Sequence, residues 1–287
     1  IRSTLLADVS PAHLHFARVR VGDAPASERV LSARGSTWQF GAAGGEEVED
    51  SGTGFGGYFV LGVEHIVTGY DHLAFVLALL LLGGSLAEVA KIVTGFTVAH
   101  SITLGLMVLG YVRPEPTPIE ALIGLSIALV AAENLWQAAG RHRAVPWLCS
   151  GALAAMALGA GAGVGSVSAL TFAGLALFTF CYFRLFEAID AAGTLRWGIA
   201  FLFGLIHGFG FAAMLAEAGL PPGRTVSALL GFNLGVEAGQ LAVVSLAWPL
   251  LVLLRRRGRA WHIVVAEGGS AAVLALGLFW FLTRTYG

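Results

Sequence analysis

The chain has 287 residues, of which 56% are hydrophobic and 12% charged, with a mean hydropathy of +0.78 and a net charge of −1. Soluble domains carry about a quarter charged residues, so this composition indicates a membrane protein. The near-neutral charge argues against a nucleic-acid partner, which would need a basic face. The two cysteines, Cys149 and Cys181, lie in apolar segments and indicate neither a disulfide framework nor a redox motif.

Residues 1–56 differ from the rest of the chain and predict a small β-rich segment before the membrane part. Residues 13–21 alternate like a β-strand, and residues 36–40 are a second candidate strand. Residues 41–57 are rich in Gly, Glu and Ser, which is typical of a linker. A segment of about 55 residues is marginal as an independent core. Because the sequence starts without Met, we expect this segment to be the end of a larger exported domain.

Residues 57–287 are predicted to form an all-α, polytopic membrane bundle, because long apolar stretches there alternate with short polar loops. We count about eight transmembrane helices. Residues 144–189 are long enough for two of them, joined by a Gly-rich turn at 159–165, and a count of six or seven is the alternative. The expected spans are 58–82, 86–110, 117–137, 145–163, 167–189, 195–218, 226–254 and 262–283.

The Lys and Arg residues near the span ends predict the orientation, because cytoplasmic loops are enriched in both. With residues 1–56 extracytoplasmic, nine basic residues fall on the cytoplasmic side and three on the other. This bias supports an extracytoplasmic N-terminal segment and an even number of spans. The nine are Lys91, Arg141, Arg143, Arg184, Arg196, Arg255, Arg256, Arg257 and Arg259, and the three are Arg113, Arg224 and Arg284.

Several ionisable residues lie inside the expected spans, where each costs roughly 2.5–3.5 kcal/mol and normally faces the bundle interior. In the first span, His65 and His72 are seven residues apart and would share one face of a continuous helix. Asp71 would lie about 100° round that helix, where it could bind separately or orient a histidine on a neighbouring helix. His72 and ionisable residues of three other spans lie about 11–15 residues from their helix starts, near the bilayer middle.

These residues predict one shared metal-binding site, made of His65, Asp71, His72, His100, His207 and Glu237. Imidazole and carboxylate without thiolate suit a divalent first-row ion such as Ni²⁺ or Zn²⁺. Residues that could surround this site or line a path to it are Glu64, Ser101, Glu120, Glu133, Asn233 and Gln240. Each residue also has a structural interpretation, since a lone intramembrane His or Glu can simply hydrogen-bond between helices. We favour that interpretation for Ser126, Asn134 and Gln240.

Three functions suit such a site. In transport, Glu120, the histidines and Glu133 would be successive stations across the membrane. In a zinc-dependent hydrolase, the histidines would hold the metal and Asp71 or Glu237 would act as general base. The same groups could also relay protons. The sequence contains no Gly-x-Ser-x-Gly elbow, Walker-type loop or His-Glu-x-x-His pair.

Five blocks of sequence resemble the HupE/UreJ family of bacterial membrane proteins, in particular its second branch, whose members carry an extracytoplasmic domain. The blocks are residues 62–72 (GVEHIVTGYDH), 96–104 (FTVAHSITL), 120–127 (EALIGLSI), 203–212 (FGLIHGFGFA) and 231–240 (GFNLGVEAGQ). The first block contains the family pattern His-x5-Asp-His. A later family motif, two histidines followed by a glutamate, is replaced here by the single His207, with Glu237 on the next span.

The resemblance implies a multi-pass protein of the bacterial inner membrane that handles nickel for hydrogenase or urease maturation. We therefore expect transport of a divalent metal ion, with Ni²⁺ as the ion that the resemblance implies. The alternatives are an intramembrane zinc-dependent hydrolase and an accessory subunit that senses or delivers metal. The expected partners are the metal ion and the lipid bilayer, together with a membrane complex or further copies of the chain.

Overall fold

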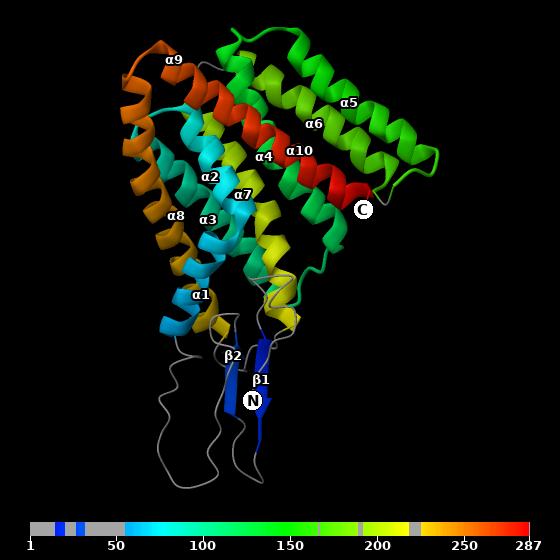
Figure 1. Cartoon of the computed structure of the whole chain (residues 1–287). Helices are drawn as coiled ribbons and strands as arrows, with labels where there is room; N and C mark the ends of the chain where they lie inside the picture. The colour runs from blue at the N-terminus through cyan, green and yellow to red at the C-terminus, as the bar shows by residue number, and fades with distance from the viewer. Residues whose placement is uncertain are drawn as a thin grey trace.

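The computed structural model describes residues 15–20, 27–31, 55–165, 167–188, 192–217 and 225–286. Apart from two short strands, the described elements are helices arranged as a bundle (Figure 1). Strands β1 (His15–Val19) and β2 (Ser27–Leu31) pair antiparallel, with His15 opposite Leu31. The first falls within the strand predicted at 13–21, whereas the strand predicted at 36–40 lies outside the described residues. Two strands do not establish a β-rich domain, which stays a prediction.

Among the described residues, seven helices are long and apolar enough to cross a bilayer, or eight spans when the bent pair α1–α2 counts as one. The chain is therefore a multi-pass membrane protein. The helices are α1 (Phe55–Thr68), α2 (Tyr70–Leu82), α3 (Leu86–Val108), α4 (Pro116–Ala138), α5 (Ala144–Gly161), α6 (Ala169–Ala188), α7 (Ala192–Glu217), α8 (Thr225–Arg256), the short α9 (Arg259–His262) and α10 (Gly269–Tyr286). A π-helical segment, Ile263–Gly268, precedes α10.

The first span is not the single continuous helix that its hydropathy predicts. It bends by 69° between α1 and α2, at Gly69, whose φ of −79° and ψ of 91° lie outside the helical region. A Cβ atom at this position would lie 2.6 Å from the carbonyl oxygen of His65 and 3.0 Å from Nδ1 of His72. Glycine therefore permits the close approach of the two histidines at the bend.

Glycines bring three pairs of helices into backbone contact. A Cβ at Gly62 of α1 would lie 2.0 Å from the carbonyl oxygen of Phe232 on α8. One at Gly204 of α7 would lie 2.3 Å from the carbonyl oxygen of Phe96 on α3, and α4 and α10 meet in the same way at Gly124. Such small-residue contacts drive helix association where lipid removes the usual hydrophobic force. They fix the helices that carry the candidate site.

Helices α5 and α6 form a hairpin at one side of the bundle (Figure 1). The ring of Phe172 on α6 lies 6.2 Å from that of Phe281 on α10, and Phe183 lies 5.3 Å from Trp136 on α4. Large apolar side chains of α5, such as Leu158, are exposed. Since the chain spans a membrane, this face meets lipid or another apolar surface.

Candidate metal centre

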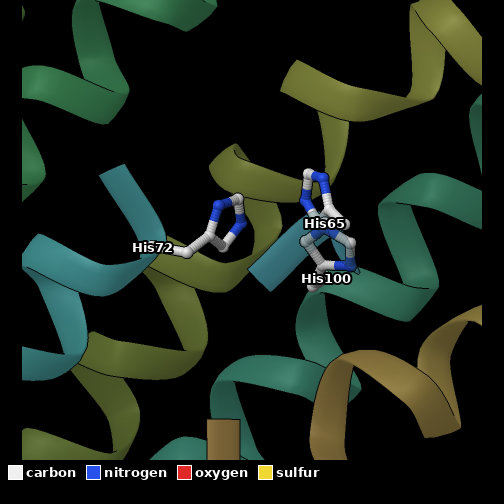
Figure 2. Close-up of side chains that lie close together, drawn as sticks. All are labelled: His65, His72 and His100. Atoms are coloured by element: carbon white, nitrogen blue, oxygen red, sulfur yellow. The ribbon is translucent and has the colours of Figure 1, made fainter. Parts of the chain in front are cut away.

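Three histidines from three helices gather inside the bundle: His65 at the end of α1, His72 at the start of α2 and His100 on α3 (Figure 2). One ring nitrogen from each lies within 4.8 Å of the other two. His72 and His100 are buried and His65 is partly buried. The structure thus brings together three of the six residues predicted as ligands.

The bend at Gly69 creates the closest of these contacts. On a straight helix, residues seven apart are separated by about 10.5 Å along the axis. Here the ring centroids of His65 and His72 lie 4.6 Å apart, because the two residues flank a sharp change of direction. The sequence predicts that the two residues share one face of a continuous helix. In the structure the helix is broken between them, and this break brings the two rings together.

Asp71 holds the ring of His72. Its Oδ1 lies 3.0 Å from Nδ1 of His72 and also accepts the backbone N–H of His72 at 2.9 Å. An ionised carboxylate can only accept, so Nδ1 carries the ring proton and Nε2 keeps its lone pair. That Nε2 atom is buried and has no hydrogen-bond partner among the described residues. Asp71 therefore orients the next residue in the chain, not a histidine on a neighbouring helix.

Asn233 of α8 plays the same part for His100. The side-chain amide of Asn233 donates to the carbonyl oxygen of Leu229 at 2.7 Å, which turns its Oδ1 toward His100 Nδ1, 3.4 Å away. The ring N–H of His100 is thus at Nδ1. Its Nε2 atom is buried and unpartnered within the described part of the chain.

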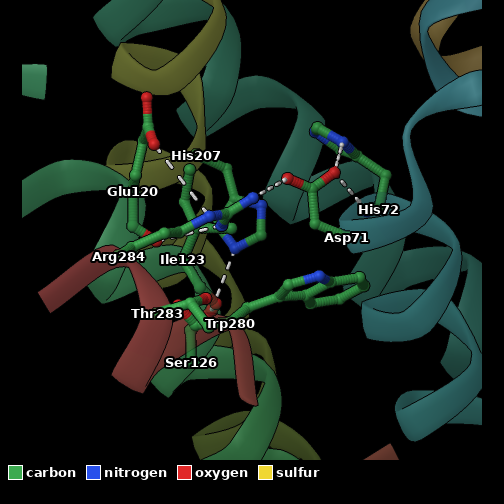
Figure 3. Close-up of polar contacts among 9 residues, drawn as sticks. All are labelled: Asp71, His72, Glu120, Ile123, Ser126, His207, Trp280, Thr283 and Arg284. Carbon is green, nitrogen blue, oxygen red and sulfur yellow. Dashed lines mark hydrogen bonds and ion pairs between the residues drawn. The ribbon is translucent and has the colours of Figure 1, made fainter. Parts of the chain in front are cut away.

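His207 of α7 lies beside this group, with its ring centroid 5.4 Å from that of His72. Its Nε2 atom lies 2.9 Å from Oγ of Ser126 on α4 (Figure 3). Because Ser126 donates its own proton to the carbonyl oxygen of Ile123 at 2.7 Å, it accepts from His207 Nε2. The lone pair of His207 is then at Nδ1, which is buried without a partner in the described residues. Ser126, expected to be a packing residue, thus orients the fourth histidine.

Buried nitrogen atoms without partners are the chemical signature of the site. They are His65 Nε2, His72 Nε2, His100 Nε2 and His207 Nδ1. A buried polar atom left unsatisfied costs about 1–3 kcal/mol, so four neighbouring ones call for a ligand. Metal-binding histidines usually donate their other ring N–H to a carboxylate, carbonyl or water, as His72 and His100 donate to side-chain oxygens here. Imidazole donors suit zinc, copper, iron and nickel, and the residues present fit such an ion.

A second carboxylate and an arginine lie next to Asp71. Arg284 of α10 has Nη2 3.8 Å from Asp71 Oδ2 and Nε 4.0 Å from Oε2 of Glu120 (Figure 3). Its Nη1 also donates to the backbone carbonyl of Glu120 at 3.0 Å. From the sequence, Arg284 is predicted only to mark the orientation of the bundle. It links Asp71 to Glu120, which is about half exposed.

Glu237, the sixth predicted ligand, is not among the donors that gather at the histidines. Its Oε1 accepts a hydrogen bond from Thr94 of α3 at 2.5 Å. Gln240, one turn further along α8, accepts from Thr97 at 2.8 Å, so both residues tie α8 to α3. Ser101 donates to the carbonyl oxygen of Thr97 on its own helix. Metal binding by Glu237 stays a prediction.

Glu133 belongs to a separate polar cluster near the end of α4. It is buried and accepts from Tyr182 at 2.5 Å, Gln137 at 2.6 Å and Arg196 at 3.3 Å. The narrow cavity beside Glu133 is also lined by Phe75, whose ring lies 5.3 Å from that of His207. Phe75 is therefore in contact with both the cavity beside this cluster and His207. Of the other predicted residues, Glu64 is partly buried on α1, next to His65.

Bilayer-spanning helices around buried imidazole nitrogens define a multi-pass membrane protein with a candidate metal centre. Residues 44–181 and 178–284 match the family described as HupE / UreJ protein. These ranges cover most of the chain, which therefore belongs to the HupE/UreJ family. Comparisons with curated proteins and with solved structures gave no significant match. The family is associated with metal transport, and the histidine group is compatible with that association.

Proposed function

We propose that the protein transports a divalent metal ion across the membrane through the histidine site, and that nickel is the first ion to test. The observation that carries this proposal is the group of buried imidazole nitrogens on four helices that have no partner among the described residues. Family membership supports it. Nickel is preferred over zinc by family association, since imidazole donors suit both.

Polar residues on either side of the site support a transport path. Toward the end of the bundle where α4 begins and α10 ends, Asp71, Arg284 and Glu120 connect the site to a half-exposed carboxylate. Toward the opposite end lies the Glu133 cluster, behind Phe75. In this proposal an ion enters past Glu120, binds at the histidines and leaves past Glu133.

Family membership supports a place in the bacterial inner membrane. The excess of basic residues at one end supports residues 1–56 as an extracytoplasmic segment before the membrane domain of residues 57–287. In this orientation Glu120 faces outward and Glu133 faces the cytoplasm. The path described above is then an uptake path.

A zinc-dependent hydrolase is the second candidate, because three histidines with an open position are a ligand set of catalytic zinc sites. Asp71 is poorly suited to be its base, because its oxygens already contact His72 and Arg284. An accessory subunit that delivers metal is a third possibility, which co-purifying partners would favour.

Metal content and transport are measured together on purified protein. Wild type is expected to bind nickel and to take up radioactive nickel in proteoliposomes. His72→Ala and His100→Ala are each expected to lower nickel binding and nickel uptake at least about tenfold, since each removes a donor. His142→Ala is the matched control, because His142 lies exposed in the α4–α5 turn.

The outcomes separate the candidates. Absence of bound metal in wild type, or equal metal content in all variants, would overturn the site. Metal that binds at the histidines and never crosses the membrane would overturn transport and favour the hydrolase or the accessory subunit.

A further inference from the structure

A second cavity, of about 640 Å³, lies at the end of the bundle where α4 turns into α5 and α6 ends. This volume falls within the range of about 300–1,000 Å³ that is typical of small-molecule sites. None of the residues of the metal centre lines it. The lining residues are Arg141, Arg143, Pro146, Trp147, Arg184 and Glu187.

The described residues that line the cavity are positively charged as a set, because three arginines face one glutamate. Glu187 is paired with Arg184 at 2.5 Å, which neutralises one of the three. Arg141 donates to the carbonyl oxygen of Phe186 on α6, and its guanidinium lies 5.6 Å from the ring centre of Trp136. Arg143 has no hydrogen bond or ion pair within the described part of the chain. Among the described residues, two guanidinium groups, those of Arg141 and Arg143, are thus without a carboxylate partner.

The backbone is strained at Arg141, in the turn between α4 and α5 that carries two of these arginines. Arg141 has a φ of 59° and is the one non-glycine residue with positive φ in the described ranges. This conformation is unfavourable for an L-residue, and such strain gathers at functional sites. The turn ends α4 and places Arg141 and Arg143 directly before the first turn of α5, at Ala144. The positive end of the α5 dipole therefore adds to the field of the arginines.

The cavity lies at the boundary of the membrane. Trp147, in the first turn of α5, is 67% exposed, as expected of a residue at the headgroup level. Beyond it, α5 crosses the bilayer with an exposed apolar face that includes Leu148 and Leu158. A ligand in this cavity can thus contact arginines with one end and a hydrocarbon-facing helix with the other.

We propose that this cavity binds the phosphate group of an anionic phospholipid, whose acyl chains pack along α5. Arginine guanidinium groups recognise phosphate oxygens through two parallel hydrogen bonds, and basic pockets between membrane helices bind such headgroups. The apolar face of α5 distinguishes a lipid from free phosphate as the occupant. This site is independent of the metal centre and of the transport proposal.

The test uses the full chain, purified in a neutral detergent, with phosphatidylglycerol, phosphatidylcholine or inorganic phosphate added. Phosphatidylglycerol is expected to raise the Tm of wild type, because a ligand that binds only the folded state stabilises it. Phosphatidylcholine and inorganic phosphate at the same concentration are expected to leave the Tm unchanged. Native mass spectrometry counts the lipids that remain bound.

Three variants assign the effect to the cavity. R143Q is expected to remove at least about half of the Tm shift, and the R141Q/R143Q double variant nearly all of it. R143K is expected to remove less than R143Q. R257Q, an exposed arginine at the end of α8 and outside the cavity, is the control. The Tm without lipid shows whether each variant is folded.

A full phosphatidylglycerol shift in the double variant, or an equal loss in R257Q, would overturn the cavity as the binding site. An equal shift with inorganic phosphate would overturn the lipid as its occupant.

Discussion

At the scale of single residues, three different side chains achieve the same result at the metal centre. Asp71, Asn233 and Ser126 each accept the ring N–H of one histidine and leave the other ring nitrogen with a lone pair in the interior. Chemistry fixes each acceptor role. An ionised carboxylate cannot donate, and Asn233 and Ser126 already donate to backbone carbonyl oxygens. The three acceptors therefore orient the histidine rings so that nitrogen lone pairs face the site, where a metal cation could bind them.

Asp71→Asn tests whether the carboxylate of Asp71 fixes the ring proton of His72. An asparagine can turn its amide toward His72 and donate, which would place the ring proton on the nitrogen that faces the site. We expect nickel affinity, measured by titration calorimetry in detergent, to fall about 10–100-fold, the usual effect of losing a partner of a metal ligand. Glu115→Gln, which alters an exposed carboxylate before α4, is the control and should change affinity little. Wild-type affinity in Asp71→Asn would show that the carboxylate does not set the ring proton.

Sequence reasoning finds the histidines more readily than their partners. Residue type and depth in the span are enough to single out His65, His72, His100 and His207. Ser126 is missed because a serine on a membrane helix usually bonds to its own backbone, and Ser126 does so while also accepting from His207. Hydropathy carries no information on which side chain lies across an interface.

At the scale of helices, the break between α1 and α2 decides the geometry of the site. Both halves of the span are apolar, so hydropathy predicts one helix, and only Gly69 marks the place where the direction changes. The partner helices are also far apart in sequence: α1 packs on α8, and α3 on α7. Gly204 and Gly208 of α7 leave room for the backbone of α3 at this contact.

The α1–α8 contact predicts a contrast between two glycines of one helix. A Cβ at Gly62 would lie 2.0 Å from the carbonyl oxygen of Phe232, whereas one at Gly56 would have no described atom within 4 Å. We expect Gly62→Ala to force the helices apart and to destabilise the fold by about 1–3 kcal/mol, the usual cost of overpacking. Gly56→Ala should be neutral or stabilising by up to about 1 kcal/mol, because alanine favours helix. Thermal unfolding in detergent measures both, and equal Tm values would contradict the packing of α1 on α8.

At the scale of the whole molecule, the expected spans correspond closely to the helices because the bilayer leaves few alternatives. Backbone groups in hydrocarbon must be paired within a helix, so a long apolar stretch has little choice of structure. Hydropathy does not decide whether the bent pair α1–α2 crosses the bilayer or returns to the side where it began. This question sets the side of every later loop, and with it the direction of the proposed metal path.

Labelling of single cysteines in intact cells answers it. With α1–α2 as a full crossing and the N-terminal segment outside, the α3–α4 turn is extracytoplasmic and the end of α8 is cytoplasmic. Cys149 and Cys181 are first replaced by alanine, since both are free thiols and Cys181 is exposed. We expect a membrane-impermeant maleimide to label Tyr111→Cys in intact cells, and to label Arg257→Cys only after permeabilisation. The reverse pattern would mean that α1–α2 re-enters or that the whole bundle is inverted. In either case Glu120 would face the cytoplasm, and the path would serve export.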